Sequence, residues 1–266
     1  MTESEKSEAG TRLTGLVRQL RPLLPAIGMV ALFLVLWQEA LEFFRVPAFL
    51  APLPTSVVSL MLSPTIPWAS NAWATLSEAL GGFALAAVVG ILIAMAIASS
   101  PWVQAVVEPL VLGAQLMPKI AFVPIFFVWF GLNYVPRVLT VFLLCLFPVV
   151  IDSAAGLTRA RRDLIDLVRP FKPSRLTVMR KVLFPTALPD IFAGLKISVT
   201  ISLLGAVVAE FVASSQGLGY LLLSGQQNLN TTLSFAAAAF LVLMGFVLFG
   251  VVAAIERVVV PWRRTS

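Results

Sequence analysis

Charged side chains within long apolar stretches are the residues of this 266-residue chain whose positions carry the most chemical information. Glu210 lies in the stretch GAVVAEFVASS, and Lys119 follows Pro118 in the stretch LMPKIAFVP. An ionisable group inside an apolar segment is energetically costly, and it usually lines a solute or ion pathway or pairs with an opposite charge. These positions therefore favour recognition of a passing solute over bond-making chemistry.

Both residues allow alternatives that the sequence leaves open. Glu210 can line a pathway, pair with a cation across a dimer, or reach water as an interfacial glutamate. A helix broken near Pro118 would place the Lys119 ammonium beside a cavity, whereas a regular helix lets it extend to the membrane interface. Glu108 precedes Lys119 by about 16 Å of regular helix, so these two pair only if the helix is irregular.

An aromatic cluster follows Lys119 within residues 122–130. Its members are Phe122, Phe126, Phe127, Trp129 and Phe130. Such rings can stack on a flat solute, although packing against lipid or protein is their more frequent role. We predict a translocation pathway that includes Glu210, Lys119, Phe126 and Phe130.

The residues that most enzymes require are missing from the sequence. The chain has no histidine and one cysteine, Cys145, which excludes a Ser-His arrangement, an internal disulfide and the common zinc sites. Neither a P-loop nor a dinucleotide-binding fingerprint occurs in its proper context. We predict no catalytic residue, no metal and no cofactor, and we interpret Cys145 as a small buried apolar residue.

The composition identifies the environment that must hold these residues. Hydrophobic residues make up 59% of the chain and charged residues 12%, with a mean hydropathy of +0.96. Soluble domains average about 45–50% apolar and about 25% charged residues. The surplus of apolar surface cannot be buried in one core, so it faces lipid. We predict an integral membrane protein with one membrane domain covering residues 1–266.

The apolar runs predict an all-α, polytopic fold with about six transmembrane helices. Each span needs about 20 largely apolar residues. The candidate spans are residues 23–41, 76–98, 103–130, 138–151, 191–213 and 235–255. Pro118 and Pro124 predict a kink or break in the third span, and the fourth is short unless it continues to Leu157. The Pro- and Ser-rich segment 45–68 is predicted to lie along the membrane surface, and the first span reads as an uncleaved helix.

The distribution of basic residues predicts the orientation. Of the 19 Lys and Arg residues, 15 lie in the tail 1–22, in the segment 158–190 or after the last span. Arg45 and Arg137 lie on the opposite side, and Lys119 and Lys196 lie within or beside spans. Cytoplasmic loops retain Lys and Arg, so both termini and the segment 158–190 are predicted to be cytoplasmic. The same rule explains the net charge of +6, so the basic composition does not require a nucleic-acid partner.

The segment 158–190 is the one long charged stretch between spans. Apolar and charged residues alternate at helical spacing around Leu164–Arg169, and Pro170 and Pro173 then break the chain. Ser174 can cap a second helix, from Arg175 to about Leu183, which is predicted to end before Pro185. Two short amphipathic helices of this kind can dock a cytoplasmic partner or rest on anionic lipid.

The stretch from Arg180 to Leu223 resembles the signature region of binding-protein-dependent ABC transporter permeases. Their loop carries an acidic residue, two alanines, a glycine four residues after the second alanine, and then nine residues before an Ile-x-Leu-Pro run. Here the acidic position falls on Asp166 and the glycine position on Lys172, with Leu167 and Val168 in place of the alanines. The run before Pro185 fits the spacing. Gly217–Tyr220 resembles the family's turn after the fifth span.

A second segment, MPKIAFVPIFFVWFG at residues 117–131, is similar to a core helix of the nitrate, sulfonate and taurine branch of this family. The resemblance covers roughly residues 55–260, with a permease core at about 73–260. It implies that the loop inserts into a groove on cytoplasmic ATPase subunits. The implied contact consists of Asp166, Leu167, Val168, Arg169, Phe171, Lys172 and Pro185.

The resemblance implies the permease subunit of an ATP-binding-cassette importer in a bacterial inner membrane. A second copy of the chain and an extracytoplasmic solute-binding protein are the other expected partners, beside the bilayer. The sequence of these segments is most similar to that of permeases for thiamine-precursor pyrimidines or riboflavin. Importers of nitrate, taurine or alkanesulfonate are the alternative. An ion-coupled secondary transporter would be expected to show internal repeats, which are not evident, and a non-transporting scaffold is a further alternative.

Overall fold

The computed structural model describes residues 24–168 and 174–262, and every described regular element is a helix. Within these described residues, four helices are long and apolar enough to cross a membrane. They are α4 (Trp68–Ser99), α7 (Tyr134–Val168), α9 (Phe184–Ala213, whose span begins in the preceding turn) and α11 (Thr231–Val259). They lie at four of the predicted spans, which confirms an all-α membrane fold.

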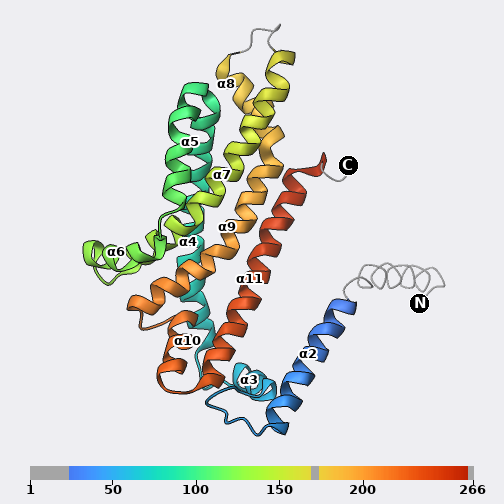
Figure 1. The fold of residues 1–266 in the computed structure, drawn as a ribbon, viewed down its shortest axis with the longest axis vertical. Helices are drawn as coiled ribbons and strands as arrows, with labels where there is room; N and C mark the ends of the chain where they lie inside the picture. Colours follow the sequence, from blue (N-terminus) through green and yellow to red (C-terminus); the bar gives the residue numbers. More distant parts are fainter. Residues whose placement is uncertain (1–23, 169–173, 263–266) are drawn as a thin grey trace, which may run out of the picture.

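The third predicted span is broken, as its prolines indicate. Helix α5 (Pro101–Gln115) is followed by a 3₁₀ turn, η1 (Lys119–Phe122), and by α6 (Val123–Phe130). The two parts form an angle of 82°, and they count as a fifth span if the bent pair crosses the membrane once. In Figure 1, α6 projects sideways from the bundle.

Shorter helices complete the chain. Helix α2 (Leu24–Phe43) lies at the first predicted span, and its crossing of the membrane stays a prediction. Helix α3 (Pro54–Met61) occupies the segment that was predicted not to span. The remaining elements of the described residues are α8 (Arg175–Val178), the π-helical turn η3 (Met179–Leu183) and α10 (Leu218–Gln227).

Two predicted boundaries around the charged segment are wrong. Residues 164–168 do not form a separate short helix, because α7 continues unbroken from the membrane span to Val168. The helix before Pro185 does not end there either, since η3 passes directly into α9. Pro185 is the second residue of α9 and directly follows this π-helical turn, in which the N–H of Phe184 bonds to the carbonyl of Met179. The fourth predicted span was short unless it continued to Leu157. Helix α7 does continue past Leu157, which confirms the longer span.

Helices α4, α7 and α9 form the core of the bundle. Fully buried residues of all three meet in one cluster, which includes Ala79, Val141 and Ala206. Gly205 permits a close approach, because a Cβ there would lie 3.0 Å from Val141 Cα. Cys145 is buried in the same cluster, and its thiol donates to the carbonyl of Ser198 at 3.2 Å, in agreement with its interpretation as a core residue.

Helix α11 is held to this core by an ion pair within the membrane spans. Lys196 Nζ of α9 donates to Glu256 Oε2 of α11 at 2.7 Å. The two side chains are 21% and 10% exposed, so the pair is largely shielded from solvent. Charges at such depth are tolerated when they neutralise each other.

The long helices run roughly parallel, which gives the molecule two distinct ends (Figure 1). One end holds α3, α10 and the start of α11. The other end holds α8 and the end of α7, and α11 ends on the side of the molecule nearer to it. Both ends carry candidate functional residues.

Candidate functional site at the two ends of the bundle

Glu210 lies near the end of α9, where the chain turns back into α10. Its side chain is only 1% exposed. The carboxylate accepts hydrogen bonds from the backbone N–H groups of Gly219, at 2.5 Å, and Tyr220, at 3.2 Å, and from the Thr75 hydroxyl at 2.6 Å. A carboxylate at a helix N-terminus satisfies unpaired N–H groups and complements the helix dipole.

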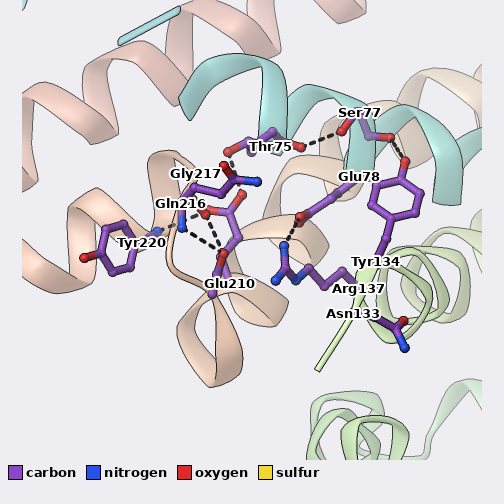
Figure 2. Close-up of polar contacts among 12 residues, drawn as sticks. Thr75, Ser77, Glu78, Asn133, Tyr134, Arg137, Glu210, Gln216, Gly217 and Tyr220 are labelled. Atoms are coloured by element: carbon purple, nitrogen blue, oxygen red, sulfur yellow. Dashed lines mark hydrogen bonds and ion pairs between the residues drawn. The ribbon is translucent and has the colours of Figure 1, made fainter. Parts of the chain in front are cut away.

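Helix α4 supplies the remaining acceptors for the start of α10. Asn71 Oδ1 accepts from the N–H of Gly217 at 2.7 Å, and Thr75 Oγ1 accepts from the N–H of Leu218 at 2.8 Å. The four consecutive N–H groups of residues 217–220 are therefore bonded to side chains of α4 and α9. Figure 2 shows Thr75 and Glu210 converging on the turn at Gly217.

A buried ion pair adjoins these contacts. Arg137 Nη1 of α7 donates to Glu78 Oε1 of α4 at 2.8 Å, with the side chains 14% and 1% exposed. Arg137 Nη2 also donates to the carbonyl of Ala213, the last residue of α9, at 3.2 Å. Nearby, the Tyr134 hydroxyl donates to the carbonyl of Ser77 at 2.7 Å (Figure 2).

We call Asn71, Thr75, Glu78, Arg137 and Glu210 the polar clasp. It joins α4 to α7, to the end of α9 and to the start of α10. Buried polar groups that are mutually bonded fix one arrangement of the elements that carry them. The clasp therefore holds the α10 end of the bundle in one geometry.

The burial of Glu210 in the clasp excludes one of the three interpretations that the sequence allowed for this residue. The residue does not reach water as an interfacial glutamate, because 1% of its surface is exposed in the chain. Its bonds go to α4 and to α10. A role of Glu210 in the solute pathway stays a prediction.

Lys119 lies at the break between α5 and α6, as predicted. Its ammonium donates to the carbonyl of Gln115 at 2.7 Å and lies 4.6 Å from the ring centroid of Phe147 on α7. The lysine thus satisfies a carbonyl at the end of α5 and makes a cation–π contact with the core. These contacts hold the bend and favour the broken-helix interpretation over extension to the interface.

The predicted aromatic residues are divided between the two faces of α6. Phe127 is buried, at 7% exposure, and packs α6 onto the bundle. Phe126 is half-buried and Phe130 is 46% exposed. Their participation in a pathway stays a prediction.

The end of α7 and the start of α9, which carry the described members of the predicted ATPase-coupling set, lie at the opposite end from the clasp (Figure 1). Asp166, Leu167 and Val168 are in the last turn of α7. Arg169, Phe171 and Lys172 lie outside the described residues. Pro185 lies at the start of α9. The cap predicted at Ser174 is present, since its hydroxyl accepts from the N–H of Thr177 at 3.2 Å.

The sequence interpretation missed most of the clasp, namely Asn71, Thr75, Glu78 and Arg137. One signal was available, because Glu78 lies within a predicted span and intramembrane charges usually pair. Arg137 was assigned to the outer side by charge counting alone. The partner of Glu78 is 59 positions away in the chain, and the sequence does not specify which helix faces which.

Comparison with known proteins agrees with the resemblance. Residues 86–262 match the family described as binding-protein-dependent transport system inner membrane component. A riboflavin transport system permease of Chloroflexus aurantiacus is 32% identical over 259 residues, covering 95% of this chain and 96% of that protein. A formylaminopyrimidine transport permease of Halalkalibacterium halodurans is 28% identical, with coverage of 93% and 98%. A taurine transport permease of Escherichia coli is 27% identical, covering 89% of each.

A solved structure agrees with the fold. A chain of the MetNI methionine ABC transporter superposes with a TM-score of 0.66, covering 74% of this chain and 99% of that one, at 18% identity. The family match covers most of the chain, and family membership implies an ATPase and a solute-binding protein as partners. The chain therefore belongs to the binding-protein-dependent ABC transporter permeases: it is a multi-pass permease subunit of an inner-membrane transport system and not itself the ATPase.

Proposed function

We propose that this permease subunit imports a small heteroaromatic vitamin precursor, a pyrimidine or riboflavin, which an external binding protein delivers. Two copies of the chain would form the pathway, and ATPase subunits would bind the segment 158–190 in the cytoplasm. Both termini would lie on that side of a bacterial inner membrane. Support for the solute class comes from the riboflavin and formylaminopyrimidine permeases, which the chain resembles over nearly its whole length.

The length of α7 is the observation that best supports the coupling role. Its 35 residues measure about 52 Å at 1.5 Å per residue, whereas the hydrocarbon core of a bilayer is about 30 Å thick. This length exceeds that thickness by about 20 Å, so the charged end of α7, from residue 158 on, would extend past the membrane surface. The protruding part begins the basic segment 158–190.

The packing of α7 supports transmission of a force from that segment. The segment connects α7 to α9, and both helices contribute to the buried core cluster with Val141 and Val199. Rigid, closely packed helices move as units, so a displacement of the segment would tilt α7 and α9 together. The clasp at their far ends would then transmit this tilt to α4 and α10.

The break between α5 and α6 is the proposed pathway element. Its backbone leaves the regular helix at membrane depth, which is tolerated where it lines a cavity or packs on protein. Lys119, Phe126 and Phe130 lie at or after this break, and the partly exposed rings present flat surfaces for a heteroaromatic solute. Glu210 is included as a charged residue of α9, as the sequence predicts.

Replacing Asp166 with lysine together with Val168 with aspartate is expected to uncouple transport from ATP hydrolysis. The double change reverses one charge and introduces another into the proposed contact, which disfavours docking of the ATPase. Uptake into vesicles that hold the complete transporter should fall by about tenfold or more, with basal ATP hydrolysis retained. An uptake rate equal to that of the unmodified complex would contradict the coupling assignment.

Solute competition tests the substrate class. Uptake of labelled riboflavin or aminopyrimidine by the complex with its own binding protein is expected to saturate and to be reduced by the unlabelled compound. Excess taurine, nitrate or alkanesulfonate should leave it unchanged. Saturable sulfonate uptake without competition by pyrimidines or flavins would instead support the alternative, an importer of nitrate, taurine or alkanesulfonate.

A further inference from the structure

A cavity of about 440 Å³ lies between α4, α5 and α7, and neither Lys119 nor any residue of the polar clasp is among its lining residues. Its polar lining consists of Gln104 and Glu108 from α5 and of Thr158 and Arg159 from α7. Apolar residues, among them Leu112 and Ile151, complete the wall. Pockets of a few hundred Å³ hold small ligands, so the volume permits a headgroup-sized molecule.

The lining changes from polar to apolar along the direction of the helices. Helices α5 and α7 run in opposite directions, with α7 heading toward the end that carries the segment 158–190. Glu108 therefore lies nearer that end than Leu112, by about 6 Å, and Arg159 lies nearer it than Ile151, by about 12 Å. In the proposed orientation, the polar half of the cavity faces the membrane surface and the apolar half extends toward the membrane interior.

The polar half carries one charge of each sign. Glu108 accepts a hydrogen bond from Gln104 at 3.0 Å. Arg159 forms a long contact with Asp190 of α9, at 3.3 Å, and its side chain remains 66% exposed. Arg159 is also the first charged residue of the segment 158–190, so in the proposed orientation its guanidinium would lie near the level of the lipid headgroups. Both groups retain capacity for a further charged partner.

We propose that this cavity binds a zwitterionic aminophospholipid, with the ammonium beside Glu108, the phosphate beside Arg159 and the start of an acyl chain along Leu112 and Ile151. An anionic headgroup would leave Glu108 without a cation, and a soluble zwitterion would leave the apolar half uncovered. The assignment rests on the proposed orientation, which places this end at the cytoplasmic leaflet. The lipid would join α5, which has no buried residue among those described, to α7.

Lipid binding to the detergent-purified, delipidated complex tests this assignment. Native mass spectrometry with phosphatidylethanolamine, phosphatidylglycerol and phosphatidylcholine is expected to show about tenfold preference for phosphatidylethanolamine, because its ammonium is the one that donates hydrogen bonds to a carboxylate. Glu108→Gln and Arg159→Gln should each remove most of this preference. Arg257→Gln, which removes an exposed charge from the last turn of α11, should leave it unchanged.

Three results would overturn the proposal. They are equal binding of the three lipids, an unchanged preference in both cavity variants, and equal binding of soluble glycerophosphoethanolamine, which would show that the apolar half is not used. Displacement of the lipid by the transported solute would reassign the cavity to the solute pathway and would likewise overturn it. Uptake measured after the same complex is reconstituted in vesicles separates the two proposals, since lost uptake with a retained lipid preference contradicts the proposed function alone.

Discussion

Replacing Arg137 with methionine is expected to lower the free energy of unfolding by about 3–5 kcal/mol, because the change leaves a buried carboxylate without its cation. That carboxylate, Glu78, is 1% exposed and bonds to Arg137 at 2.8 Å. In the described part of the chain, its other oxygen has no hydrogen-bond partner to replace the arginine. The change also removes the donor to the carbonyl of Ala213, so the end of α9 loses its tie to α7. Thermal unfolding of the purified permease in detergent measures the effect.

Arg45 provides the matched control for this experiment. It is exposed and lies on the same predicted side of the membrane, so Arg45→Met removes the same charge from that side without opening a buried pair. We expect a change within about 0.5 kcal/mol. The double variant Glu78→Gln with Arg137→Met should recover much of the loss, because no unpaired charge remains. Equal stability of the two single arginine variants would contradict a structural role for the clasp.

Replacing Gly217 with alanine is expected to cost about 2–5 kcal/mol, from backbone strain and steric overlap together. Gly217 has φ of +118° and ψ of +163°, a conformation that L side chains rarely adopt. A Cβ at this position would overlap the carboxylate of Glu210. The side chain that anchors α10 would therefore be displaced together with the turn. Thermal unfolding and amide hydrogen exchange across residues 217–227 report the loss.

Gly250→Ala is the control for this second prediction. Gly250 lies within α11, and a Cβ there would have no atom within 4 Å. Alanine is a better helix former than glycine, so this variant should be unchanged or more stable by about 0.5–1 kcal/mol. Faster exchange confined to α10 in Gly217→Ala would locate the damage at the clasp. Identical unfolding of the two alanine variants would refute the steric and backbone argument.

The sequence was most informative where one local property decides the structure. Length and apolarity located the four long spans, and Pro118 with Pro124 indicated the break between α5 and α6. The helix ends were less accurate, because charged residues and proline suggested that the helix stops. Within a membrane bundle, α7 keeps its hydrogen bonds through Arg159, and Pro185 fits at the start of α9.

The polar clasp could not be predicted in the same way, because it depends on which helices are neighbours. Thr75 and Glu210 are separated by 135 positions, and only the packing of α4 against α9 brings them to 2.6 Å. The turn at Gly217–Tyr220 was predicted after the fifth span, but its role as the capped start of α10 was not. Such pairings are set by tertiary contacts, which composition and periodicity do not contain.

ATP-driven uptake is the most direct test of the proposed mechanism, in which a separate ATPase drives import through the segment 158–190. The complete transporter is reconstituted in vesicles. The binding protein and the labelled solute are added on the side of the membrane opposite the ATPase subunits, and ATP is supplied on the ATPase side. We expect uptake that requires ATP and the ATPase subunits, persists with an uncoupler present, and is lost in the Asp166→Lys, Val168→Asp variant. Uptake that continues after ATP depletion and is abolished by the uncoupler would contradict this mechanism and indicate an ion-coupled transporter.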